Sequence, residues 1–394
     1  MPFAEWNDRF RDTARTFWLE DVDGGSDFGR ISLQEMSTRL CGSADLFATE
    51  PGRGAPASIN FVSCHDGFTL TDLTRYRSKH NEANGENNND GSSVNHSANF
   101  GVEGVTDDPD VIAAREQAAM NMIGMLLLSL GTPMMLAGDE FRNTQDGNNN
   151  AYCQDNDITW LKWDWMYSTN KTREMRRLET VSRLVALRKS LDLYHHEDFF
   201  TRLTQLGLLK PSSRVQWFLP DGTTPMERDW FDLGVRSFTM RLLSNSEVDV
   251  CIVVNGTADD RTFRLPPDTH WTPKWCSAEI NGRRAGHGTQ VEECDLNGDT
   301  TVWTQHVPDA SETVLKMVKE VAMQRTESST ENEADTIKFA MPVTDHAANG
   351  TSSAPRDEVS ADMPDAPVDD TPDTPVDDNV WTMPALSITL MKQV

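Results

Sequence analysis

The chain has 394 residues, 62 of them acidic and 36 Lys or Arg, which gives a formal net charge of -26. This balance argues against nucleic acid or an anionic membrane as a partner, because both are bound through positive side chains. A neutral polymer such as a polysaccharide is compatible with it. The length predicts two or three domains, at roughly 100 to 200 residues each.

The amino terminus and the cysteines indicate a cytoplasmic protein. The first residues, MPFAEW, lack the basic and then apolar segments of a signal peptide. The six cysteines lack metal-motif or redox-motif spacing, and the histidines show no convergent zinc pattern. We therefore expect no disulfide, no cofactor and no metal. The cysteines are Cys41, Cys64, Cys153, Cys251, Cys276 and Cys294.

The most informative segment is INFVSCHDGF, at residues 59–68. A short apolar run, suited to a buried strand, is followed by a histidine, a carboxylate and a glycine. Barrel enzymes present catalytic side chains in this way, at the carboxyl ends of their strands. His65 and Asp66 are therefore candidate site residues. The alternative is an ordinary polar turn at the end of a strand.

A buried helix is predicted after this motif. Asp108 and Pro109 are a cap and a first-turn proline, and Gly131 is a stop signal. The apolar run 120–130 inside it is shorter than the about 20 residues of a membrane span.

A second strand motif follows that helix. Residues 133–138 form another apolar run that ends in glycine, and Asp139 and Glu140 come next. Strand, helix and strand in alternation indicate a parallel sheet.

The predicted secondary structure changes from helix to strand near Phe199. Before it, residues 169–189 predict a helix with Ser168 or Thr169 as its cap. After it come short β-rich runs separated by turn residues, the pattern of an antiparallel sandwich. The runs lie at 215–219, 237–240, 248–254 and 262–265.

An acidic segment interrupts the second half. Residues 326–379 contain 14 acidic and 2 basic residues and few large apolar ones, so we expect disorder. Its function is either that of an interaction tail or that of a solvated linker. Residues 380–394 are again a strand pattern. The predicted domains are a partial barrel (1–198), a β-sandwich (199–325), an acidic insertion (326–379) and the last sandwich strand (380–394).

Five long motifs together resemble the carboxyl-terminal half of a glycogen debranching enzyme or isoamylase, in the α-amylase superfamily. Besides the strand ending in HDG, they are AEWNDRFRD at 4–12, KHNEANGE at 79–86, AGDEF at 137–141 and GNNNAYCQDN at 147–156. The resemblance implies that this chain supplies about strands six to eight of a (β/α)8 barrel, followed by an antiparallel β-sandwich.

The resemblance also implies which chemistry is present. Retaining glycosidases need two carboxyl groups about 5 Å apart, a nucleophile and a general acid. In the family these lie on the fourth and fifth barrel strands, so we expect neither here. Asp66 matches the third acid of the family, a transition-state stabiliser, and His65 matches an imidazole that binds the same sugar.

Further substrate-binding residues are implied by the resemblance. Asn148, Tyr152 and Asp155 belong to one matching motif, and Asp139 and Glu140 to another. Asp139 and Glu140 contact sugar or only organise their loop. The asparagine-rich loops 86–91 and 146–150 line a glucan groove or are simply turns.

A tryptophan cluster follows these motifs. Trp160, Trp163 and Trp165 either stack on sugar rings or seal the junction between barrel and helix.

Three functional hypotheses remain. The first is a fragment of a hydrolase that cleaves α-1,6 branch linkages of glycogen or a related α-glucan, inactive by itself. The second is a noncatalytic half-barrel that binds glucan or a partner. The third is one chain of a split enzyme, whose partner supplies the missing amino-terminal half. No hypothesis involves nucleic acid or a membrane.

Overall fold

The computed structural model describes residues 3–19, 22, 30–48, 53–194, 199, 215–243, 249–267, 270–288, 290–293, 379–385 and 387–393. All of them belong to one compact unit, formed by residues 1–315 and 377–394. Residues 326–378, nearly all of the predicted acidic insertion, lie outside the described residues. So do the residues on both sides of Phe199, where a domain boundary was expected.

The first half of the chain contains a three-stranded parallel sheet in the order β1-β2-β3. Its strands are β1 (Glu5–Asn7), β2 (Ser58–Asn60) and β3 (Thr132–Pro133). They are shorter than the apolar runs suggested. Beyond Asn60 the chain leaves the sheet. The carbonyl oxygen of Val62 instead accepts a hydrogen bond from the buried Arg15 side chain.

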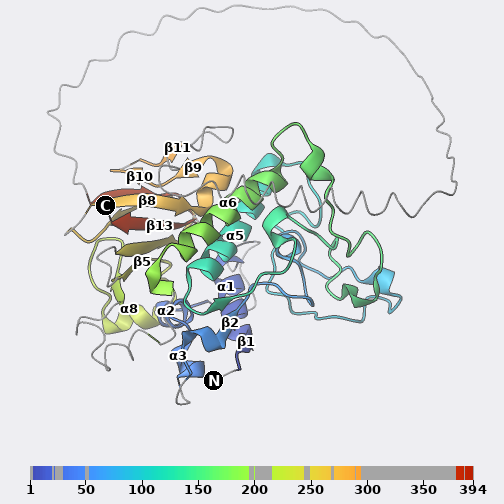
Figure 1. Cartoon of the computed structure of the whole chain (residues 1–394), viewed down its shortest axis with the longest axis horizontal. Coiled ribbons are helices and arrows are strands. Elements are labelled where there is room, and N and C mark those ends of the chain that lie inside the picture. The colour runs from blue at the N-terminus through green and yellow to red at the C-terminus, as the bar shows by residue number, and fades with distance from the viewer. Residues whose placement is uncertain are drawn as a thin grey trace, which may run out of the picture. The chain divides into compact units, whose positions relative to one another are not determined.

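Helices accompany this sheet, and Figure 1 shows those of the amino-terminal segment, in blue, beside β1 and β2. The α-helices are α1 (Asp8–Leu19), α2 (Leu33–Leu40), α3 (Ala44–Phe47), α4 (Leu70–Leu73), α5 (Pro109–Leu128) and α6 (Arg173–Lys189). Short 3-10 turns are η2 (Ala55–Ala57), η3 (Glu82–Asn84), η4 (Asp139–Phe141), η5 (Ala151–Cys153), η6 (Asp164–Tyr167) and η7 (Asp192–Tyr194).

The starts of the two long helices can be compared with the sequence signals. The prediction for α5 is confirmed, since the Asp108 side chain accepts from the backbone N–H groups of Asp110 and Val111. The predicted cap of α6 is wrong. Thr172 caps that helix by accepting from the Met175 N–H, whereas the Ser168 hydroxyl accepts from the Asn170 N–H in a turn before it.

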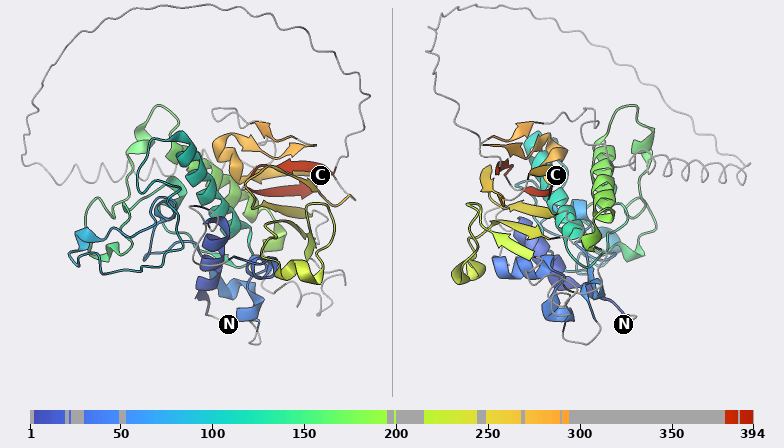
Figure 2. Two further views of the ribbon diagram at one scale, coloured as in Figure 1. Left: turned by 180° about the vertical axis from the view of Figure 1, so that it is seen from behind. Right: turned by 60° about the vertical axis from the view of Figure 1, so that its left-hand side comes forward.

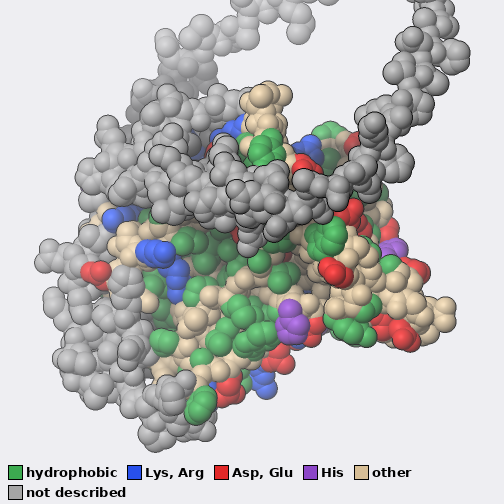
Figure 3. Space-filling view, turned by 45° about the vertical axis from the view of Figure 1, so that its right-hand side comes forward, with side chains coloured by type: hydrophobic (Ala, Val, Ile, Leu, Met, Phe, Trp, Pro, Cys, Tyr) green, Lys and Arg blue, Asp and Glu red, His purple; other side chains and the backbone are tan. Residues whose placement is uncertain are grey.

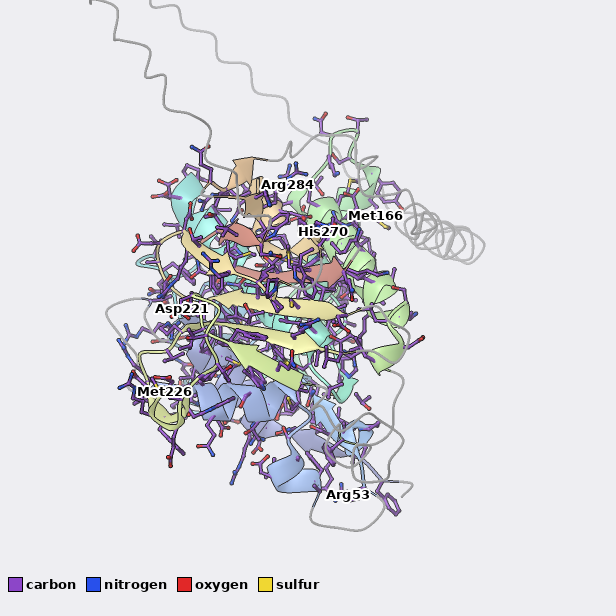
Figure 4. The ribbon with its side chains drawn as sticks, turned by 90° about the vertical axis from the view of Figure 1, so that its left-hand side faces the viewer. Arg53, Met166, Asp221, Met226, His270 and Arg284 are labelled. Carbon is purple, nitrogen blue, oxygen red and sulfur yellow. The ribbon has the colours of Figure 1, made fainter. Side chains whose placement is uncertain are left out.

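The second half forms a five-stranded antiparallel sheet in the order β4-β5-β6-β13-β8. Figure 4 shows these strands side by side, with Asp221 and Met226 near one side of the sheet and Met166 near the other. The strands are β4 (Val215–Phe218), β5 (Ser237–Leu242), β6 (Val250–Asn255), β8 (Trp271–Cys276) and β13 (Ser387–Gln393).

Smaller sheets accompany it. β10 (Gly286–His287), β12 (Val380–Met383) and β7 (Arg261–Arg264) form one, and β9 (Arg283–Arg284) pairs with β11 (Glu292–Glu293). The remaining elements are α8 (Glu227–Phe231) and η8 (Ser277–Asn281). The predicted strands at 215–219, 237–240, 248–254 and 262–265 correspond to β4, β5, β6 and β7.

The carboxyl-terminal segment divides into two strands at Pro384, where the sequence had suggested one. Proline lacks the N–H that a continuous ladder requires. β12 pairs with β7 and β10, whereas β13 lies between β6 and β8. Because β13 lies between β6 and β8, the sheet is complete only with these carboxyl-terminal residues.

Both faces of the five-stranded sheet are buried. Cys251, Val253 and Met391 pack with Phe263 and Trp381 of the smaller sheet. Residues on the opposite face belong to the same core as α1, α5 and α6; Figure 2 shows α5 and α6 beside the strands. β5 and β6 are therefore buried along their whole length, which explains the nearly continuous apolar sequence of β6.

Helix α5 approaches the five-stranded sheet closely at Gly124. A Cβ added there would lie 2.7 Å from Ile388 Cγ2 and 2.9 Å from Trp275 Cη2. Trp275 is fully buried, and its indole N–H donates to the Thr180 carbonyl of α6 at 3.3 Å. α5 could cross a membrane by length and composition alone, but 78% of its apolar window is buried inside the protein.

We predict that Gly124→Ala destabilises the chain by about 1 to 3 kcal/mol through overpacking. Helix propensity by itself would give the opposite sign, because alanine is about 1 kcal/mol better than glycine in a helix. Urea unfolding followed by circular dichroism measures the difference. Ala114→Leu, at an exposed position of the same helix, should stay within about 0.5 kcal/mol of the parent, because leucine and alanine have similar helix propensities. A more stable Gly124→Ala chain would contradict the close contact.

Candidate functional site

His65 and Asp66 follow the end of β2, and both side chains are exposed. The Cys64 thiol donates to Asp66 Oδ1 at 2.8 Å. This bond lowers the pKa of Asp66 below its ordinary value, with a further contribution from His65. Asp66 is therefore ionised at neutral pH. The chain turns at Gly67 (φ +81), whose N–H donates to the Asn149 carbonyl at 2.9 Å.

Aromatic side chains lie beside this pair. The rings of Trp6 and His65 meet edge to face with centroids 5.6 Å apart, and Trp6 lies 5.5 Å from Phe61. Trp6 is 49% exposed. The Arg11 guanidinium lies over the Phe61 ring and bonds Asp12. The face in Figure 3 shows apolar side chains in a broad area, with acidic groups scattered along its border.

Asp139 is fully buried behind the His65–Asp66 turn. One carboxylate oxygen accepts from the Leu70 N–H at 3.0 Å and the other from the Ser63 hydroxyl. These two partners stand on either side of the turn in the sequence. Burial raises the pKa of Asp139 to about 7. This position fits the loop-organising alternative, because direct contact with sugar requires an accessible oxygen.

Glu140 is only partly buried. It accepts from the Gly138 N–H at 2.8 Å, and burial raises its pKa.

Two buried charge groups that the sequence did not reveal support these loops. Arg15 donates to the carbonyls of Val62 at 2.7 Å and Asn95 at 3.0 Å. Glu116 of α5 forms two ion pairs, each at 2.8 Å. One partner is Arg177 of α6, and the other is Arg142, which follows η4. The two arginines lower the pKa of Glu116 although burial opposes this. The sequence did contain one sign of this group, because Glu116 is a charged residue within a helix that was predicted to be buried.

A network of asparagine side chains joins the segment 81–95 to the asparagine-rich loop 146–150. Asn81 Nδ2 donates to Asn149 Oδ1 at 2.9 Å, and the Asn149 N–H donates to Asn81 Oδ1 at 2.9 Å. Asn149 Nδ2 donates to Asn95 Oδ1 at 2.8 Å. All three asparagines are buried. Gly91 (φ +71) packs directly against these asparagines, since a Cβ there would be 2.3 Å from Asn149 Oδ1.

Asn148 belongs to the same network. It is buried, and its Nδ2 donates to Asn84 Oδ1 at 2.8 Å. Gln154 donates to the same Asn84 oxygen at 2.8 Å, and Asn84 donates to Asp90 at 2.7 Å. These amides are engaged with one another, so their geometry fits a loop-forming role.

The remaining predicted site residues stand in solvent. Tyr152 is 84% exposed. Asp155 is exposed and accepts from the indole N–H of Trp160, another exposed residue, at 3.1 Å. Trp163 and Trp165 are half-buried against Phe141, with ring centroids 4.8 Å and 5.4 Å away. Of the three tryptophans, Trp160 is thus the one presented to solvent.

Cys64 is an additional member of the site. The cysteine spacing gave no sign of this, yet Cys64 Sγ and the ligand atoms of His65 and Asp66 all lie within 4.8 Å of one another. Burial raises the pKa of Cys64 to about 11. It is therefore a neutral hydrogen-bond donor at neutral pH rather than a nucleophile.

Comparisons with known proteins agree with the motifs. No protein-family model matches the chain. A glycogen operon protein GlgX homolog of Mycobacterium bovis is 42% identical over 242 residues, 60% of this chain and 31% of that protein. A glycogen debranching enzyme of Pectobacterium atrosepticum is 38% identical over 297 residues, 75% of this chain and 41% of that protein. The chain thus spans less than half the length of these relatives.

A solved structure resembles the fold. The crystal structure of GBS pullulanase SAP in complex with maltotetraose matches with a TM-score of 0.50 and 10% identity, covering 99% of this chain and 39% of that one. At this level of identity the likeness concerns the fold alone.

We predict that the difference in stability between the parent and Asp139→Asn depends on pH. The folded chain binds a proton at Asp139 up to about pH 7, whereas the unfolded chain releases it near pH 4. Stability is therefore lost as pH rises between these values, at up to about 1.4 kcal/mol per pH unit. Denaturant unfolding from pH 4 to 8 measures this change. Asp157→Asn is an exposed control, and a constant difference for Asp139→Asn would refute the burial of a titrating carboxyl.

We predict that Asn149→Ala destabilises the chain by about 1 to 3 kcal/mol, because it leaves buried polar partners unsatisfied. Limited proteolysis should then cut 79–95 and 145–154 faster. Asn89→Ala is the matched control, since Asn89 is exposed and its side chain donates only to the nearby Glu86 carbonyl. Equal effects of the two changes would mean that the network does not hold the loops.

Proposed function

We propose that this chain, a relative of the bacterial glycogen debranching enzymes in the α-amylase superfamily, is the carboxyl-terminal part of a glycoside hydrolase. The reaction proposed is cleavage of α-1,6 branch linkages of glycogen or a related α-glucan. Because the chain spans only part of its relatives, the activity belongs to the completed catalytic unit.

The observation that carries the proposal is the exposed pair His65 and Asp66. They sit together on a glycine turn after β2, and Asp66 is ionised. A carboxylate and an imidazole can hydrogen-bond neighbouring hydroxyls of one sugar ring. We assign Asp66 to hydrogen bonds that strengthen as the ring approaches the oxocarbenium-like transition state. His65 binds the same sugar.

The nucleophile and the general acid are proposed to lie outside this chain. A retaining mechanism needs two carboxyl groups about 5 Å apart at the glycosidic bond. Asp139 is unsuited to either role, because its carboxyl is fully buried and bonded to Leu70 and Ser63. We therefore expect no hydrolysis by the chain alone.

The other candidate residues receive different roles in this proposal. Tyr152 and Asp155 are accessible and are assigned to the outer part of the glucan site. Asp139 and Asn148 are positioning residues that hold the surrounding loops, and Glu140 is only half-accessible. The location proposed is the cytoplasm, where a bacterial glycogen enzyme meets its polymer.

We predict that Asp66→Asn lowers kcat at least about a hundredfold in a completed enzyme, because a transition-state contact is lost. The completed enzyme joins this chain to the preceding part of the Pectobacterium relative. Reducing ends released from glycogen measure the rate, and the unfolding temperature should change little because Asp66 is exposed.

Asp107→Asn, at an exposed carboxyl before α5, is the matched control and should leave kcat unchanged. A completed enzyme that lacks activity on branched glucan would contradict the proposed reaction. Enzyme-like release of reducing ends by the isolated, monomeric chain would instead show that the catalytic pair lies within it. Equal loss of stability and activity in Asp66→Asn would mean that Asp66 is structural.

A further inference from the structure

Three consecutive side chains after β2 bring different metal-binding atoms together. Cys64 Sγ, an imidazole nitrogen of His65 and a carboxylate oxygen of Asp66 lie within 4.8 Å of one another. In a regular strand, successive side chains point to opposite faces. Here the strand has ended at Asn60 and the chain turns at Gly67, so the turn makes the three atoms converge.

The spacing of these atoms suits one ion. Zn–S and Zn–N bonds of about 2.3 Å and 2.0 Å place the ligands of a tetrahedral ion roughly 3 to 4 Å apart. Cys64 Sγ is already 2.8 Å from Asp66 Oδ1. His65 and Asp66 are exposed, so small side-chain rotations can bring the remaining separations into this range without moving the core.

The donor types decide which ions fit. Calcium and magnesium prefer sets made only of oxygen. A sulfur, a nitrogen and an oxygen together favour zinc and softer cations of similar geometry.

The charges near the site are mixed. Arg11 and Arg15 are its cationic neighbours, and Arg11 is paired with Asp12 at 2.7 Å. The chain as a whole carries a charge of -26, which favours the approach of cations to the molecule.

We propose that Cys64, His65 and Asp66 form a three-ligand site for a thiophilic divalent cation such as Zn²⁺ or Cd²⁺. Water occupies the fourth tetrahedral position, which the three side chains leave open, as in other three-ligand sites. The Cys64 thiol releases its proton to solvent on binding. Metal–sulfur and metal–oxygen bonds then replace its hydrogen bond to Asp66.

The ion regulates the candidate site by competition. It occupies the imidazole and the carboxylate that would otherwise bind sugar, so cation and glucan exclude each other. This consequence rests on the proposed function, whereas the coordination itself does not.

Titration of the whole chain with CdCl₂ tests the coordination. The ultraviolet thiolate-to-cadmium charge-transfer band should rise to saturation at one equivalent. Cys64→Ser should abolish the band, and His65→Ala should weaken Cd²⁺ binding at least about tenfold. Cys153→Ser, which removes an exposed thiol, is the matched control and should leave the band intact.

Other results overturn the site. They are an unchanged band in Cys64→Ser, a band lost in Cys153→Ser, or no saturable binding in the parent. His65→Ala keeps the test valid if Cys64→Ser unfolds, because His65 is exposed and its removal leaves the core intact. An unchanged affinity in a folded His65→Ala chain also contradicts the site.

Calorimetric titration with maltotetraose, with and without Cd²⁺, separates this inference from the proposed function. Weaker sugar binding in the presence of Cd²⁺ supports the competition. Simultaneous, independent binding of both overturns it. Cadmium bound by Cys64 with no sugar binding contradicts the glucan site of the isolated chain and leaves the metal site standing.

Discussion

The buried carboxylate of Glu116 is the contact on which the candidate site depends. It lies on α5 and is held by Arg177 of α6 and by Arg142. Arg177 also donates to the Thr71 hydroxyl at 3.3 Å and to the Asp139 carbonyl at 3.4 Å. Removing one member of such a group leaves buried charge uncompensated, at a cost of about 3 to 5 kcal/mol. One ionic contact thus fixes two helices and the loop that carries Asp139.

From Asp139 the contacts lead directly to the exposed residues. Its carboxyl bonds Ser63 and Leu70, which lie before and after the His65–Asp66 turn. Gly67 in that turn bonds the Asn149 carbonyl, and Asn149 is locked to Asn81. Two exposed polar side chains are therefore held by a buried support, which is the arrangement that a preorganised binding site requires.

The five-stranded sheet and η8 contribute to the same support through other positions of α5. Gly124 lets Ile388 and Trp275 pack against the helix, and Gln117 donates to the Ser277 hydroxyl at 2.9 Å. α5 has a charged contact toward the candidate site and a tightly packed contact toward the sheet. This explains why a helix with so few polar residues still carries Glu116 and Gln117 in its interior.

The local features could be predicted from short stretches of sequence. The start of α5 at Asp108–Pro109, the strands β4 to β7 and the HDG motif depend on neighbouring residues, whose capping, periodicity and turn preferences act over short distances.

The other features depend on contacts that form only when the chain folds. The burial of Asp139, the lock between Asn81 and Asn149 and the charge group at Glu116 join residues far apart in the chain. The convergence of Cys64 with His65 and Asp66 depends on the point at which β2 stops pairing. The start of α6 and the division at Pro384 follow from competing hydrogen bonds and sheet partners, which a linear pattern does not contain.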